Sequence, residues 1–141
     1  MRVLFDTCII IDYLLNRKDL SEDAKKVIIP VVENTLYGFI TVKSLMDIYY
    51  IIRKYLHDEN KTRDIINTLL DSFVLLDSTK ADAIKALVSN CHDYEDALMI
   101  ETAKSYDMDY IVTRNIKDYK NSSIPVIIPN KLHSIIKTQQ Q

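Results

Sequence analysis

The sequence predicts an α/β protein, a three-layer α/β/α sandwich with a central, mainly parallel sheet. Short apolar runs alternate along the chain with longer segments whose apolar residues recur at helical spacing. The only glycine is Gly38, which leaves few tight hairpin turns for antiparallel strands. Right-handed crossovers between parallel strands place helices on both faces of such a sheet. We expect the first strand to lie at or near the centre.

Five segments are predicted to be strands, because each is short, apolar and bounded by polar residues or prolines. In chain order they are residues 2–6, 36–41, 73–77, 109–113 and 124–129. The first run, RVLFD, ends in an acid, which places a carboxylate at the end of a buried strand.

The intervening segments have apolar residues at helical spacing and are predicted to be helices. They are residues 8–16, 21–34, 44–56, 61–72, 79–90 and 93–107, followed by a short helix that begins at residue 132. Ser21 is expected to cap the second helix, and Pro30 is expected to bend or break it. Residues 135–141 are expected to form a frayed tail. The whole chain, residues 1–141, is interpreted as one domain.

Composition excludes several classes of phosphate-binding protein. A single glycine cannot form a dinucleotide-binding fingerprint or a Walker A loop, which need three and two glycines. The net charge of -2 argues against a broadly basic nucleic-acid coat. With 48% hydrophobic residues, the chain of 141 residues has enough apolar side chains for a substantial core.

The remaining composition indicates a cytoplasmic protein without a membrane segment. Cys8 and Cys91 lack the spacing of a zinc site, and we expect both to be reduced. The N-terminal apolar stretch contains Asp6 and Asp12, so it does not resemble a signal peptide. No apolar run approaches the length of about 20 residues that a membrane span needs.

Oxygen-bearing side chains are predicted to gather at the edge of the sheet where the parallel strands end. Four separate segments of the chain contribute them: Asp6; Asp47; Asp93 and Asp96; and Thr113, Asn115 and Asp118. Hard divalent cations such as Mg²⁺ prefer oxygen ligands, and several carboxylates in one place repel one another unless a cation is bound. Such a site suits in-line cleavage of a phosphodiester bond.

Several of these acids also have a structural interpretation. Asp93-x-x-Asp96 and Ser44-x-x-Asp47 both have the form of a capping box. Asp118 could be a surface acid, since lysines lie close to it in the sequence. Asp6 is the hardest to explain in this way, because a partly buried carboxylate without a partner is unfavourable.

Four stretches of the sequence resemble the PIN-domain family, especially its short prokaryotic members. They are RVLFDTCIIID, SLMDIYYIIRK, DYEDALMIETAKSYDMDYIVTRNIKDY and NSSIPVIIP. The resemblance implies a ribonuclease with Mg²⁺ or Mn²⁺, a homodimer, and a role as the toxin of a toxin–antitoxin pair. RNA and an antitoxin protein are then the expected partners.

The resemblance also assigns residues. Asp6, Asp47 and Asp96 match the first three acids of the family, and the fourth is either Asp118 or Asn115. Asp6 and Asp96 are the expected metal ligands. Many relatives have Glu where this chain has Asp47, whose shorter side chain is expected to reach the ion through a water molecule.

Residues around these acids are given supporting roles. Arg114 and Lys117 are expected to bind substrate phosphates. Thr113, Asn115 and Asp93 are expected to hold the ligands in place through hydrogen bonds.

Three alternative functions remain to be weighed. A haloacid-dehalogenase-type phosphatase would need a second acid where Cys8 stands, and a receiver domain would need an acid pair at the end of strand one. Both are disfavoured. The serious alternative is a catalytically silent PIN domain that acts as a nucleic-acid-binding or protein-assembly module.

Overall fold

Five parallel strands form one sheet in the computed structural model, which describes all residues from Met1 to Gln141. They are β1 (Arg2–Phe5), β2 (Tyr37–Thr41), β3 (Val74–Leu76), β4 (Tyr110–Val112) and β5 (Val126–Ile127). Their order is β3-β2-β1-β4-β5, and every pairing is parallel. The predicted parallel sheet with the first strand at its centre is therefore confirmed.

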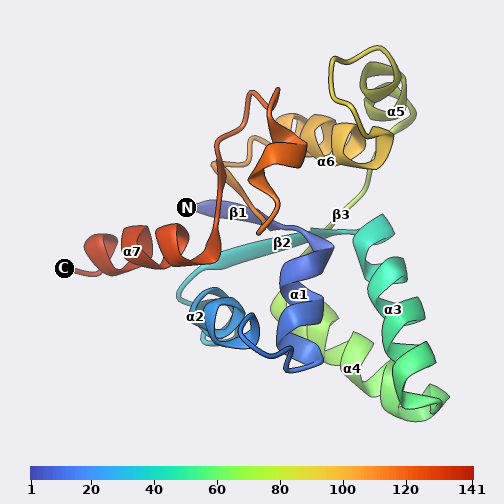
Figure 1. The fold of residues 1–141 in the computed structure, drawn as a ribbon, viewed down its shortest axis with the longest axis vertical. Coiled ribbons are helices and arrows are strands. Elements are labelled where there is room, and N and C mark those ends of the chain that lie inside the picture. Colours follow the sequence, from blue (N-terminus) through green and yellow to red (C-terminus); the bar gives the residue numbers. More distant parts are fainter.

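Helices cover both faces of the sheet, as the three-layer prediction requires. They are α1 (Thr7–Leu14), α2 (Ser21–Val32), α3 (Val42–Leu56), α4 (Glu59–Ser72), α5 (Lys80–Leu87), α6 (Tyr94–Ser105) and α7 (Pro129–Gln139), with a short 3₁₀ helix η1 at Ile116–Tyr119. Figure 1 shows α5 and α6 on one side of the sheet and α1 to α4 on the other. The sequence did not predict η1.

Alternation along the central strand divides the interior into two cores. Val3 and Phe5 belong to the larger core, on the side of α1, α2 and α3, whereas Leu4 belongs to the smaller core on the side of α6. The ring of Phe5 packs edge-to-face on Phe73, with 5.2 Å between the ring centroids. Because successive side chains of a strand point to opposite faces, this buried run fixes β1 between two helical layers.

Gly38 is required by close packing between β2 and α2. A Cβ atom at this position would lie 2.7 Å from both methyl groups of Val31 and 2.9 Å from Cε1 of Phe73. The absent side chain therefore lets α2 approach the sheet.

Helix α2 departs from its prediction at both ends. Ser21 is buried inside the helix, and the preceding Leu20 makes no side-chain cap, so the predicted Ser21 cap is wrong. Pro30 does not break the helix, which continues to Val32. Proline has no N–H to donate to the carbonyl four residues earlier, that of Lys26. Nδ1 of His133 lies 3.2 Å from this oxygen and can donate to it when protonated there.

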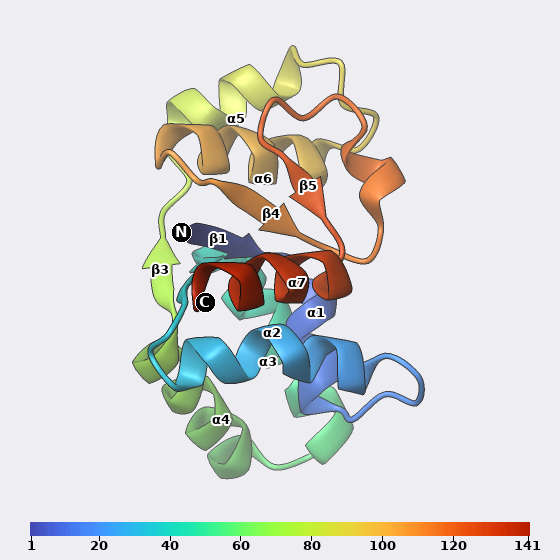
Figure 2. The ribbon, with the colours of Figure 1, turned by 90° about the vertical axis from the view of Figure 1, so that its left-hand side faces the viewer.

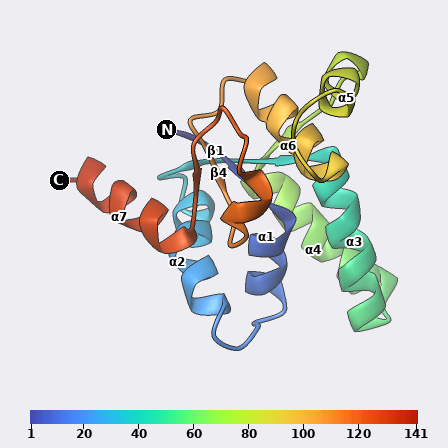
Figure 3. The ribbon, with the colours of Figure 1, turned by 45° about the horizontal axis from the view of Figure 1, so that its top comes forward.

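His133, which approaches the carbonyl of Lys26, belongs to α7, and α7 lies beside α2 (Figure 3). Helix α7 begins at Pro129 and continues to Gln139, so residues 135–139 are helical and the predicted frayed tail is wrong over that range. Leu132 and Ile136 of this helix are buried in the larger core.

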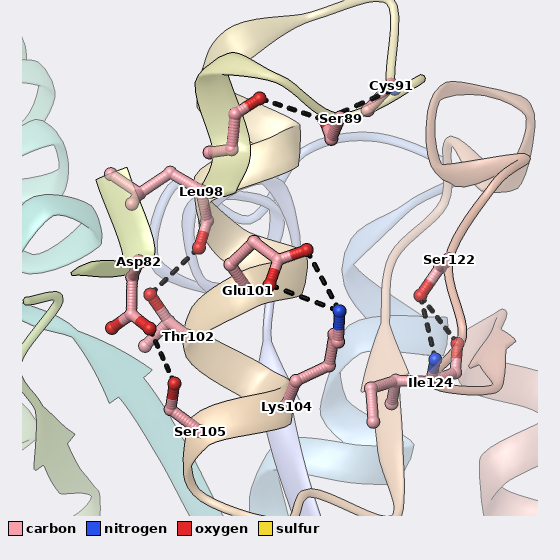
Figure 4. Close-up of polar contacts among 11 residues, drawn as sticks. Asp82, Ser89, Cys91, Leu98, Glu101, Thr102, Lys104, Ser105, Ser122 and Ile124 are labelled. Carbon is pink, nitrogen blue, oxygen red and sulfur yellow. Dashed lines mark hydrogen bonds and ion pairs between the residues drawn. The ribbon is translucent and has the colours of Figure 1, made fainter. Parts of the chain in front are cut away.

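Polar contacts fasten α5 to α6, the helix that carries Asp96 (Figure 4). Thr79 and Asp82 form a capping box at the start of α5. The Asp82 carboxylate, which is buried, also accepts a hydrogen bond from the hydroxyl of Ser105 at the end of α6. This contact therefore holds α5 against α6.

Cys8 and Cys91 are both free thiols. None of the helices combines the length and apolar character that crossing a bilayer demands.

Candidate active site

The strands end together at one edge of the sheet, and the predicted site lies there. Figure 2 shows the arrows of β1 and β4 pointing toward the same end of the molecule, where the orange 3₁₀ helix also lies. A cavity of about 610 Å³ opens at this edge. Its lining contains five predicted site residues, which are Asp6, Asp47, Asp96, Asn115 and Asp118.

Asp6 is held in place by the neighbouring strand. Its backbone N–H donates to the carbonyl of Val112, with 3.0 Å between nitrogen and oxygen. The buried hydroxyl of Thr113 donates to Oδ2 of Asp6 at 2.8 Å and accepts from the backbone N–H of Asn115 at 3.1 Å. The expected contact between Thr113 and the first acid is therefore present. It fixes the carboxylate's orientation before any ligand binds.

Asp96 lies in the first turn of α6 and faces the same cavity. Asp93 caps this helix, because its Oδ1 accepts the backbone N–H groups of Glu95 and Asp96. The reciprocal bond from Asp96 is not formed, so the capping-box interpretation does not account for Asp96. Burial raises the pKa of Asp96 to about 6, with further contributions from the charges of Asp93, Asp6 and Asp118.

Asp47 is positioned differently from the sequence interpretation. Helix α3 begins at Val42, and Thr41 caps it by accepting the N–H of Ser44. The capping-box interpretation of Ser44-x-x-Asp47 is therefore wrong. Asp47 instead forms an ion pair with Lys43, whose ammonium group also lies 3.0 Å from Oε2 of Glu95.

The two candidates for the fourth position both reach the cavity. Asn115 precedes η1 and Asp118 lies within it, and both side chains line the cavity wall. The charge of Asp118 contributes to the raised pKa of Asp96, which places the two carboxylates close enough to repel each other. Asp118 therefore belongs to the same electrostatic group as Asp6 and Asp96.

Arg114 does not line the main cavity with Asp6, Asp96 and the other acids. Its Nε donates to Oδ2 of Asp12 at 2.8 Å, and its side chain lines a different, smaller cavity between α1, α2 and the start of α7. Asp12 is 1% exposed and also accepts from Arg17 at 3.2 Å. Arg17, which the sequence interpretation missed, lines the main cavity. Two arginines that share one buried carboxylate are fixed in position by it.

Lys117 lines a second cavity of about 450 Å³ next to the first. Asp96 and Asp118 line both cavities and so form the wall between them. Lys120 and His92 line the second cavity as well, and neither Lys117 nor Lys120 takes part in an ion pair. Lys117 therefore lies next to the acidic cavity without lining it, and its expected binding of phosphates stays a prediction.

The chemistry of the main cavity suits a divalent cation, although its side chains do not form a closed cage. Five carboxylates and two cationic side chains line the cavity, which leaves an excess of negative charge. No three Asp, Glu, His or Cys side chains lie close enough together to ligate one ion as they stand. The oxygen donors fit Mg²⁺ or Mn²⁺, and binding requires them to draw together around the ion.

Sequence reasoning missed three residues that line the main cavity: Arg17, Glu95 and Tyr119. The position of the Arg17 side chain depends on its contact with the buried Asp12. The position of the Glu95 side chain depends on the angle between α3 and α6. Neither relation is visible in a local pattern. Tyr119 follows directly after Asp118, which is the one local signal that pointed toward it.

The PIN-domain family model matches residues 2–117, and the chain belongs to the PIN-domain family. A comparison with curated proteins finds no match.

Several solved structures share the fold. A toxin–antitoxin complex from Klebsiella pneumoniae has a chain 25% identical in sequence, with a TM-score of 0.66 over 90% of this chain and 97% of that one. VapBC2 from Rickettsia felis, bound to a DNA fragment from their promoter, is 14% identical, with a TM-score of 0.65 over 91% and 98%. FitAcB from Neisseria gonorrhoeae is 16% identical, with a TM-score of 0.62 over 90% and 97%. The last two similarities are evidence of the fold alone.

Proposed function

We propose that this protein is a Mg²⁺- or Mn²⁺-dependent endoribonuclease and the toxin of a toxin–antitoxin pair. The observation that carries the proposal is the convergence of carboxylates from four separate segments on one cavity, in a chain of the PIN-domain family. An excess of carboxylates around one cavity is unfavourable without a cation, so the cavity favours a divalent ion.

Asp6 and Asp96 are the proposed metal ligands. Thr113 orients Asp6 through its hydroxyl, and Asp93 sets the start of the helix that carries Asp96. Asp118 is preferred to Asn115 as the fourth residue, because its charge acts on Asp96. A bound divalent ion would supply Lewis-acid stabilisation of the phosphate and an activated water molecule.

Asp47 is proposed to act on the attacking water rather than to ligate the ion directly. Its carboxylate is paired with Lys43, which also pairs with Glu95 across the cavity from another helix. An ammonium group between two carboxylates reduces the negative charge on that side. Asp47, held in place by Lys43, is proposed to orient the water without being the principal ligand.

The substrate's phosphates are proposed to bind at lysines and at Arg17 rather than at Arg114. Arg17 lines the main cavity, and Lys117 and Lys120 line the neighbouring one beyond Asp96. A single RNA strand that crosses the wall between the two cavities would place a phosphate beside Asp96 and its next phosphate beside the lysines. Such contacts make binding depend on salt.

We further propose an antitoxin partner, a homodimer and a cytoplasmic location. The antitoxin is suggested by the likeness to a chain of a toxin–antitoxin complex. The dimer is suggested by exposed apolar side chains on α3, which include Met46, Tyr50 and Tyr55. Light scattering of the protein at tens of micromolar tests the dimer, and a monomeric mass would contradict it.

The proposed activity is tested by incubating a labelled RNA pool with the protein in Mg²⁺, in Mn²⁺ and in excess chelator. We expect cleavage with either ion and none in chelator. Asp6→Asn should abolish cleavage while leaving the fold intact, because it removes charge at nearly constant size. Asp64→Asn, on an exposed part of α4, is the matched control. Absence of cleavage of any RNA by the metal-loaded wild type would favour the silent binding module.

A further inference from the structure

Tyr119 carries a polar atom without a partner. Its side chain is 3% exposed, and its hydroxyl is the one buried side-chain oxygen or nitrogen in the chain that makes no hydrogen bond. Buried polar groups in folded proteins are nearly always paired, because a buried donor without an acceptor loses the hydrogen bond that it made to water. This exception therefore needs a physical explanation.

The position of this hydroxyl points to the proposed metal site. Tyr119 is the last residue of η1 and lines the main cavity together with Asp6 and Asp96. Burial raises the pKa of Tyr119 far above its ordinary range, and the charges of Asp6 and Asp96 raise it further. The hydroxyl lies close enough to the carboxylates of Asp6 and Asp96 to interact with both, but its contact with neither of them reaches hydrogen-bond geometry.

The surrounding contacts leave this donor free for an added oxygen atom. Oδ2 of Asp6 is bonded to the hydroxyl of Thr113, and no oxygen of Asp6 or Asp96 accepts from Tyr119 at hydrogen-bond geometry. The space next to the tyrosine is the cavity itself, and Mg²⁺ keeps several water molecules when it binds to a few carboxylates. A water molecule between the two carboxylates would supply the missing acceptor.

We propose that Tyr119 is a positioning residue whose hydroxyl donates a hydrogen bond to a water molecule in the hydration shell of a divalent ion held by Asp6 and Asp96. This inference rests on the proposed metal-dependent function. It explains why the hydroxyl is buried at the acidic cavity without a partner. The donor is satisfied only when the ion and its water are present, so Tyr119 couples the stability of the protein to metal binding.

The test compares wild type with Tyr119→Phe, which removes only the hydroxyl. Tyr49→Phe is the control, because the Tyr49 hydroxyl is bonded to Glu59 at 2.8 Å and lies outside the cavity. Mn²⁺ affinity is measured by titration calorimetry, and melting temperatures are measured in chelator and in saturating Mn²⁺. We expect Tyr119→Phe to raise the Mn²⁺ dissociation constant by roughly fivefold to tenfold, the effect of one hydrogen bond. Tyr49→Phe should leave it unchanged.

In chelator, Tyr119→Phe should melt at the wild-type temperature or above it, because the lost hydroxyl had no partner. A lower melting temperature in chelator would show that the hydroxyl bonds within the protein and would overturn the inference. Equal Mn²⁺ dissociation constants for wild type and Tyr119→Phe would also overturn it, while leaving the proposed function standing. A wild type that binds no Mn²⁺ would instead remove the proposed function and this inference together.

Discussion

Replacing Asp96 by asparagine should stabilise the metal-free protein at neutral pH. The substitution removes one negative charge and changes the size of the side chain very little. Burial and the charges of Asp93, Asp6 and Asp118 raise the pKa of Asp96 from 3.8 to about 6, so ionising this carboxyl is unfavourable in the folded state. Asparagine removes that unfavourable charge.

The direction of the pH dependence follows from this raised pKa. The folded protein binds the Asp96 proton more tightly than the unfolded chain does. The stabilisation from the protonated Asp96 carboxyl is therefore fully present below about pH 4. It is lost as the pH rises through about 6 and does not change further at higher pH. Raising the pKa of Asp96 from 3.8 to about 6 corresponds to at most about 3 kcal/mol in the free energy of unfolding. Because the carboxyl is partly exposed, solvent screening lowers the expected gain in Asp96→Asn to about 1 kcal/mol.

Urea unfolding in chelator measures this gain. At pH 7.5 we expect Asp96→Asn to have a free energy of unfolding about 1 kcal/mol higher than wild type, and at pH 4 the two should be equal. Asp64→Asn should differ little from wild type at either pH, because its side chain is on an exposed part of α4. Added Mn²⁺ should stabilise the wild type and have little effect on Asp96→Asn.

Two results would refute this reasoning. Equal stability of wild type and Asp96→Asn at pH 7.5 would mean that the carboxylates do not repel one another. A gain that persists unchanged at pH 4 would mean that the substitution acts through packing rather than through charge.

Three further outcomes are expected. Gly38→Ala should lower the free energy of unfolding by about 2 kcal/mol in urea titrations, because its Cβ would overlap the side chains packed on β2; unchanged stability would contradict the packing. Asp12→Ala should lower the free energy of unfolding by about 2 kcal/mol, because two arginines lose their shared acceptor. A loss of less than a few tenths of a kcal/mol would show that the two ion pairs do not stabilise the protein. Replacing both Lys117 and Lys120 by glutamine should weaken binding of an uncleavable 2′-O-methyl RNA and reduce the log–log salt slope by about 1.4, at about 0.7 per phosphate contact. Lys137→Gln, in α7, is the control, and an equal slope for the double variant would exclude these lysines from the RNA path.

The sequence was sufficient to predict the order of layers and much of the site. Continuous apolar runs such as VLF, residues 3–5, occur where a strand is buried on both faces, and the parallel order follows from the helices between the strands. The placement of Asp6 and Asp96 at one cavity could be predicted because each lies at a strand end or helix start. In a parallel sheet these positions meet at one edge.

The errors arose where a partner distant in the sequence determined the outcome. Pro30 is tolerated within α2 because His133 of α7 lies beside the carbonyl that proline leaves free. Arg114 was expected to bind substrate phosphates, and this role stays a prediction; what the sequence did not indicate is that its Nε donates to the buried carboxylate of Asp12 in α1. Local patterns describe neighbours along the chain, whereas these contacts join residues about 100 positions apart.

The most direct test of the account is anomalous diffraction from crystals of the protein grown with Mn²⁺. We expect one strong peak in the main cavity, bounded by Asp6 and Asp96, with metal–oxygen distances of about 2.1 Å. The same crystals of Asp6→Asn should lose the peak while keeping the fold. A wild-type crystal with no peak in this cavity at saturating Mn²⁺, or with its only peak elsewhere on the molecule, would contradict the proposed metal site.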